Sequence, residues 1–148
     1  VSNCSFKKVS NHHGVPFLEK KQSSLIINKT NKNDIMKILG NPSTKSKFDN
    51  DVWIYIERRQ TQSQLSNLGK MKIYKNDVLV LEIDKFGILK KKEFYNKDDM
   101  KDLKIVKATT ETGFKRDTFL YNFMSSMRQK INDPLNKRVE KQKEISQR

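Results

Sequence analysis

The sequence predicts an α+β fold, in which short N-terminal helices pack on a three-stranded antiparallel β-meander and a further helix is added near the C-terminal end. Two observations predict the mixed class: a short helix with a clear start and stop over residues 32–39, and apolar strands at 52–58 and 78–83. The third observation is an apolar stripe at helical spacing over residues 117–131, which predicts the added helix.

The helix over residues 32–39 carries a signal at each end. Asn31 is a favoured N-cap residue, and Asp34 stands three positions later, where a carboxylate can reach free backbone N–H groups. Gly40 can adopt the left-handed conformation that closes a helix, and Pro42 prevents its continuation. The sequence therefore predicts a helix that ends at Leu39.

This helix is amphipathic. Ile35, Ile38 and Leu39 recur at the i, i+3, i+4 spacing of one helical face. Because a helix of about two turns is unstable alone in water, we expect this face to pack on a sheet. Upstream, residues 18–28 contain Leu18, Leu25 and Ile26, which can share one face of a short helix or belong to an extended piece.

The sheet is expected to be a meander. In the first strand, Val52, Ile54 and Ile56 alternate with Trp53 and Tyr55, so both of its faces are apolar. The second strand covers residues 78–83. A type I turn is predicted at 84–87, and a lysine-rich third strand returns over 88–95. Residues 72–74 are expected to add pairing ahead of the second strand.

One layer of helices covers only one face of such a sheet, so the other face needs a second cover. The helix over 117–131 is the candidate, since five apolar residues line one of its sides: Leu120, Phe123, Met124, Met127 and Ile131. Packing within the chain is the simpler interpretation. The alternative is a partner-binding helix, for which Phe123 and Met127 are the candidate contacts.

The net charge of +14 indicates a polyanionic partner, either nucleic acid or an anionic membrane. A second interpretation is compositional, because most of the 31 basic residues are lysines spread over the whole chain. The accompanying abundance of Asn and Ile is what an AT-rich genome would produce. The segments "YIERR" and "KKKEFY" are only weak matches to the interleaved aromatic and basic pattern of nucleic-acid-binding strands.

No catalytic, cofactor or metal motif is present in the sequence. Phosphate-binding glycine loops and nucleophile elbows are absent. Cys4 is the only cysteine, and His12 and His13 are neighbours without a nearby cysteine, so a zinc site is not expected. We therefore expect no enzyme activity, no cofactor and no small-molecule substrate.

The order of these features resembles a known family. The segment "NKNDIMKILGNPSTKSKFDNDVWIYI" is similar to the signature of the outer-membrane assembly lipoproteins called BamE, or SmpA/OmlA. The later "VLVLEIDKFGIL" resembles the hairpin of that family, and "TTETG" with the apolar helix after it is similar to the C-terminal extension of α-proteobacterial members. The matching structural positions are Asn31, Ile35, Ile38, Leu39, Gly40, Pro42, Trp53 and Tyr55, together with Phe48.

The resemblance implies a non-catalytic subunit of the BAM complex, the machine that folds and inserts outer-membrane β-barrel proteins. It implies a lipid anchor on the periplasmic face of the outer membrane, with other BAM subunits and anionic outer-membrane lipid as partners and no nucleic acid. "VSNC" resembles the processing site of a lipoprotein, so Cys4 is the candidate for lipidation. The chain begins at Val1 and not at Met, so a signal peptide would lie in a segment upstream of the given sequence.

The expected organisation has four parts. Residues 1–17 form a flexible leader with the lipidation cysteine, residues 18–96 the BamE-like α+β domain, residues 97–131 an extension with the amphipathic helix, and residues 132–148 a polar tail. The loop at 43–51 lies beside the capped helix, where Phe48 is a candidate partner contact. Two other functions stay open: a basic nucleic-acid-binding module, and a periplasmic inhibitor or chaperone with the same small fold.

Overall fold

The computed structural model describes residues 10–62, 71–99 and 111–132. The chain divides into two compact units, residues 1–97 and 98–148. Among the described residues, the first unit contains five strands and two helices, and the second contains one long helix. The α+β class predicted from the sequence is thus confirmed.

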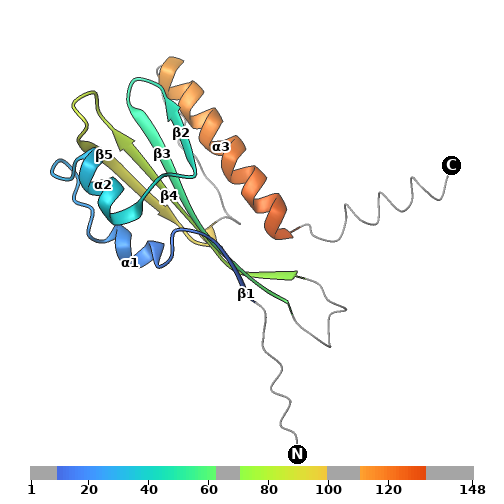
Figure 1. The fold of residues 1–148 in the computed structure, drawn as a ribbon. Helices are drawn as coiled ribbons and strands as arrows, with labels where there is room; N and C mark the ends of the chain where they lie inside the picture. The colour runs from blue at the N-terminus through green and yellow to red at the C-terminus, as the bar shows by residue number, and fades with distance from the viewer. Residues whose placement is uncertain (1–9, 63–70, 100–110, 133–148) are drawn as a thin grey trace, which may run out of the picture. The chain divides into compact units, whose positions relative to one another are not determined.

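The sheet of the first unit is antiparallel and is built on two long central strands (Figure 1). They are β3 (Asp51–Gln62) and β4 (Met71–Ile83), and β5 (Leu89–Tyr95) pairs with the far side of β4. Two short strands, β1 (Ser10–Gly14) and β2 (Thr44–Lys47), both pair with β3. β2 pairs with residues 51–54 and β1 with residues 57–61, so they share one edge of β3.

The helices α1 (Leu18–Gln22) and α2 (Lys32–Leu39) lie on one face of this sheet (Figure 1). α2 begins and ends at the predicted residues: the Asn31 side chain accepts a hydrogen bond from the Asp34 backbone N–H, and the Gly40 N–H donates to the Met36 carbonyl. Gly40 has the positive φ, 74°, that favours glycine, but its ψ of −154° differs from the predicted left-handed helical conformation. The Gly40 carbonyl also accepts a 2.9 Å hydrogen bond from the Tyr55 hydroxyl. The C-terminal end of α2 is therefore fixed directly to β3.

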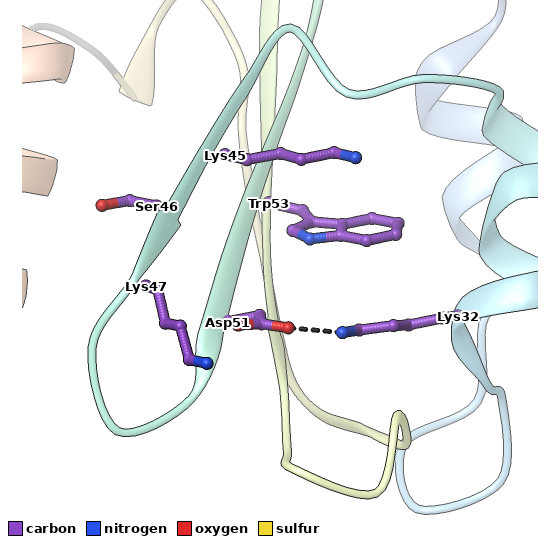
Figure 2. Close-up of a pocket in the computed structure, with 6 residues that line it drawn as sticks. All are labelled: Lys32, Lys45, Ser46, Lys47, Asp51 and Trp53. Carbon is purple, nitrogen blue, oxygen red and sulfur yellow. Dashed lines mark hydrogen bonds and ion pairs between the residues drawn. The ribbon is translucent and has the colours of Figure 1, made fainter.

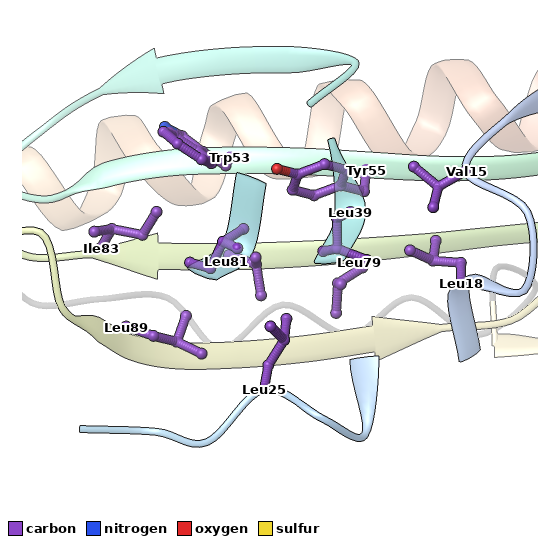
Figure 3. Packing of buried hydrophobic residues seen from close by; sticks show 11 residues of the cluster. Val15, Leu18, Leu25, Leu39, Trp53, Tyr55, Leu79, Leu81, Ile83 and Leu89 are labelled. Carbon is purple, nitrogen blue, oxygen red and sulfur yellow. The ribbon is translucent and has the colours of Figure 1, made fainter. Parts of the chain in front are cut away.

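The core lies between these helices and the sheet (Figure 3). Ile35 and Leu39 are buried, and Ile38 is partly buried against the same cluster, so the prediction that this face meets the sheet is confirmed. From the strands, the cluster takes the side chains of one face of the sheet: Trp53, Tyr55, Leu79, Leu81, Ile83 and Leu89. Complete burial of one large aliphatic side chain stabilises a fold by about 2 kcal/mol.

The turn between β4 and β5 forms where the sequence predicts it. The Gly87 N–H donates to the Asp84 carbonyl, and Gly87 has a φ of 82°. The Asp84 carboxylate accepts from the backbone N–H groups of Phe86 and Ile88. These hydrogen bonds, with the charge of Lys90, outweigh desolvation and hold the pKa of Asp84 below its ordinary value.

The predicted three-stranded meander is too small, because β1 and β2 enlarge the sheet to five strands. Residues 10–14 were expected in a flexible leader, and residues 44–47 in a polar loop. Both segments pair with the edge of β3 through backbone hydrogen bonding, which needs no apolar side chains. Their exposed and polar residues therefore give no strand signal in the sequence.

The segment over 18–28 also differs from its prediction. α1 ends at Gln22, and Leu18 and Leu25 are buried, whereas Ile26 is 53% exposed. These three residues thus do not share one buried helical face. Beyond α1 the backbone turns toward β5. There the Asn28 N–H donates to the Leu89 carbonyl, and the Leu89 N–H donates to the Thr30 carbonyl.

In the second unit, α3 (Glu111–Asn132) confirms the predicted C-terminal helix and begins six residues before the predicted start at 117. Leu120, Met124 and Met127 are buried, and Phe123 is partly buried. The predicted polar tail at 132–148 starts one residue too early, because Asn132 still belongs to α3. The side chain of Ile131 and residues 133–148 lie outside the described residues. None of the helices within the described ranges is long and apolar enough to cross a membrane.

Gly14 is expected to be irreplaceable, because it has a φ of 87° and a Cβ there would lie 1.9 Å from the Ile56 carbonyl oxygen. Gly14→Ala should lower the free energy of unfolding by about 3 kcal/mol and speed hydrogen exchange in β1. Gly87→Ala is the control, since its φ is similar but its Cβ would meet only a Lys32 side chain at 3.8 Å. Urea denaturation that gives equal losses for both variants would contradict this role of Gly14.

Candidate partner-binding site

Trp53 is the centre of a cationic hollow on the first unit. It lies on β3 opposite Lys45 of β2, on the face of the sheet that carries α2. The Lys45 ammonium lies 4.8 Å from the centre of the indole ring, and that of Lys32, from the first turn of α2, lies 5.8 Å away. Figure 2 shows the two lysines on opposite sides of the ring, at distances typical of cation–π attraction.

Asp51 completes this arrangement. Its carboxylate forms an ion pair with Lys32, drawn in Figure 2, and thereby joins the start of β3 to the start of α2. The open hollow has a volume of about 360 Å³ and is lined by Lys32, Lys45, Ser46, Lys47, Asp51 and Trp53. Three lysines face one carboxylate here, so the hollow is cationic and has an aromatic wall.

Such a lining suits the binding of an anionic group better than it suits a reaction. An ammonium group attracts a carboxylate or a phosphate, and the indole offers apolar contact area. In residues 10–62, 71–99 and 111–132, no group of three or more His, Cys, Asp and Glu side chains is arranged to hold a metal ion.

A second cluster of charges surrounds Glu57, further along β3. Its buried carboxylate accepts hydrogen bonds from the backbone N–H groups of Leu18, at 2.9 Å, and Phe17, at 3.2 Å. Arg59 donates to it at 3.1 Å, and the nitrogens of Lys75 and His12 lie within 3.7 Å and 3.4 Å of it. Glu57 therefore fixes the start of α1 and the β1 segment to the sheet.

The two carboxylates of this cluster have pKa values that are shifted in opposite directions. Burial raises the pKa of Glu57, but the Leu18 and Phe17 amides, with Lys75 and His12, lower it more, so it lies below its ordinary value. Asp77 is the cross-strand partner of Glu57. Burial raises the pKa of Asp77, the charge and hydrogen bond of Lys75 lower it, and the nearby charges of Glu57 and Glu19 raise it, so the pKa stays above its ordinary value.

The structure brings most of the predicted motif residues together. Asn31, Ile35, Ile38, Leu39, Gly40 and Pro42 lie in or beside α2, and Trp53 and Tyr55 lie beneath it on β3. The burial of Tyr55 raises the pKa of its hydroxyl and agrees with the prediction that Trp53 and Tyr55 mainly belong to the core.

The candidate contact residues are more scattered. Phe48 is partly buried in the turn between β2 and β3, whereas Phe123 and Met127 belong to α3 in the second unit. Cys4 lies outside the described residues. The partner contacts and the lipidation thus stay predictions.

Sequence reasoning missed both charged clusters. Glu57 continues the alternation of Trp53 and Tyr55, so its position on an apolar strand face was a signal of a buried carboxylate. The spacing of Lys45 and Lys47 was a weaker signal, because it acquires meaning only once residues 44–47 are known to form a strand beside Trp53.

A family model described as the outer membrane protein assembly factor BamE domain matches residues 17–92, just over half of the 148 residues. The chain belongs to the BamE family. A search of curated proteins and a search of solved structures each gave no match.

The BamE match begins at Phe17, immediately before α1, and ends within β5. It includes the Trp53 hollow and Glu57, but leaves β1 and α3 outside. BamE proteins are outer-membrane assembly factors, non-catalytic accessories that associate with other BAM subunits. The BamE domain of this chain accordingly includes the cationic hollow in full.

Glu57→Gln is expected to lower the free energy of unfolding by about 1–3 kcal/mol at neutral pH, because hydrogen bonds to a buried charge are lost. Since the pKa of Glu57 is lowered in the fold, its stabilisation is complete above the ordinary carboxylate pKa and is lost as pH falls through the folded value. Denaturation measured across acidic pH should thus show a shallower loss of stability in this variant than in the unmodified protein.

Asp77→Asn is the matched comparison. Because the pKa of Asp77 is raised, its ionised form weakens the fold, and that penalty disappears as pH falls. This variant should be unchanged or more stable at neutral pH and should lose stability more steeply in acid. Equal acid profiles for the two variants would refute the assignment of opposite roles.

Proposed function

We propose that this chain is a non-catalytic, lipid-anchored subunit of the BAM complex on the periplasmic face of the outer membrane. There it would aid the folding and insertion of β-barrel proteins. The observation that carries the proposal is the BamE match over residues 17–92, which covers the helices and most of the sheet of the first unit. Other BAM subunits are the proposed partners, with Phe48, Phe123 and Met127 as candidate contacts.

Cys4 is the proposed site of the lipid anchor. Five residues separate it from Ser10, where β1 begins, and a chain of that length spans at most about 20 Å. β1 is held on the sheet by five residue pairs with β3, and the Val15 N–H donates to the Ile56 carbonyl. A lipid on Cys4 would therefore keep the folded unit close to the membrane surface.

Anionic lipid is the proposed second partner. The chain carries a net charge of +14, and a basic residue close to an anionic membrane surface contributes about 1 kcal/mol to binding. A basic surface would add to the attachment that the acyl groups on Cys4 provide.

The same charge favours the alternative of a nucleic-acid-binding module, because phosphate contacts depend on lysine and arginine. The two functions require different compartments. A chain that is lipidated on Cys4 lies on the far side of the inner membrane from the genome, so the state of Cys4 separates them.

Affinity purification tests the proposed complex. The protein, tagged at its C-terminal end and extracted from outer membranes with mild detergent, is expected to recover the barrel-assembly subunits, identified by mass spectrometry. An unrelated outer-membrane lipoprotein with the same tag is the control for recovery through shared lipid. Recovery of no barrel-assembly component would count against the proposal.

Metabolic labelling with palmitate tests the anchor. The unmodified protein is expected to incorporate the label and to fractionate with membranes, whereas Cys4→Ser should lose the label and appear in the soluble fraction. Intact mass measurement should show the corresponding acyl groups on Cys4. A Cys4 that stays unmodified in protein still carrying its upstream segment would exclude lipidation.

A further inference from the structure

We propose that β2 and the Trp53 hollow together form a docking site for an extended acidic segment of a partner protein. The segment would add to the open edge of β2 as a further strand and place carboxylates beside Lys45 and Lys47. This inference rests on the proposed function, since it specifies how a BAM-associated subunit would hold one of its partners.

The pairing of β2 favours strand addition by a partner. Within the described part of the chain, β2 pairs with β3 alone, so no strand covers its second edge. The backbone of such an edge can pair with an extended peptide, which is a common mode of peptide recognition. Thr44 and Ser46 are partly buried, whereas Lys45 and Lys47 are exposed, as expected for residues that alternate between two faces.

The charges beside β2 suit an acidic segment. Lys45 and Lys47 lie opposite Trp53 and Asp51 in the register of β2 with β3, so both belong to the face that carries the hollow. The Asp51 carboxylate already forms an ion pair with Lys32. Lys45 and Lys47 also line the hollow, and β2 itself contains no acidic residue that could pair with them. A strand with acidic residues at alternate positions would bring its carboxylates to these two ammonium groups.

The position of the hollow along β3 favours a protein segment over a lipid headgroup. The leader joins the sheet at Ser10, which pairs with Thr61 of β3. Trp53 stands eight residues away along the same strand, a distance of about 26 Å. If the anchor is on Cys4, the hollow lies at the end of β3 opposite the attachment point, where a protein partner has better access than the membrane.

Trp53 provides a direct readout, because it is the single tryptophan of the chain. The probe is a synthetic eight-residue peptide of alternating Glu and Val, titrated while Trp53 fluorescence is recorded. We expect a saturable change that weakens as salt is added. A peptide with proline in place of each Val cannot pair as a strand and should leave the fluorescence unchanged.

Charge-matched variants locate the site. Lys45→Gln combined with Lys47→Gln is expected to weaken peptide binding roughly tenfold, as the loss of two partly exposed ion pairs implies. Lys90→Gln combined with Lys91→Gln removes the same charge from β5, the other edge strand, and should bind as the unmodified protein does. Circular dichroism of each variant confirms that the fold is retained.

Three outcomes would overturn the inference. Equal weakening in the two double variants would indicate attraction by overall charge, and binding of the proline peptide would exclude strand addition. A change in Trp53 fluorescence with phosphatidylglycerol vesicles but not with the acidic peptide would assign the hollow to lipid headgroups. The affinity purification tests the proposed function separately. If the unmodified protein recovers barrel-assembly subunits, the proposed function holds even where the docking inference fails, and only a failure to recover them contradicts the function.

Discussion

The fold depends on the contact between α2 and the sheet. A helix of eight residues does not hold its shape in water, so α2 exists because Ile35 and Leu39 are buried against the strands and because Tyr55 binds the carbonyl at its end. The same contact sets the position of Lys32 at the opposite end of the helix. The cationic surroundings of Trp53 are thus a direct product of core packing, and the hollow needs no loop to position its walls.

The sequence was sufficient for those parts whose causes are local. The cap at Asn31 and the stop at Gly40 act within a few residues, and the alternation around Trp53 and Tyr55 reports a strand with two apolar faces. These signals allowed the helix, the central strands and the family to be identified. They also showed that Trp53 belongs to the core, although not that two ammonium groups flank its ring.

The remaining features depend on partners that are distant in the chain. β1 and β2 are polar segments that become strands because an edge of β3 is available. Their own residues do not indicate that this edge exists, so their composition does not predict a strand. Glu57 shows the same limit: its carboxylate fixes backbone N–H groups some forty residues earlier in the sequence. Contacts of this kind join residues that are far apart in the chain, so they cannot be predicted from a short stretch of sequence.

The pairing of β1 also has a consequence for the order in which the sheet forms. β1 pairs with residues 57–61, which follow it by more than forty positions. During synthesis β1 is therefore complete before its partner exists, and it has no edge to join until residues 57–61 have followed. The first strand is thus fixed in place only after α1 and α2, which follow it, have been made.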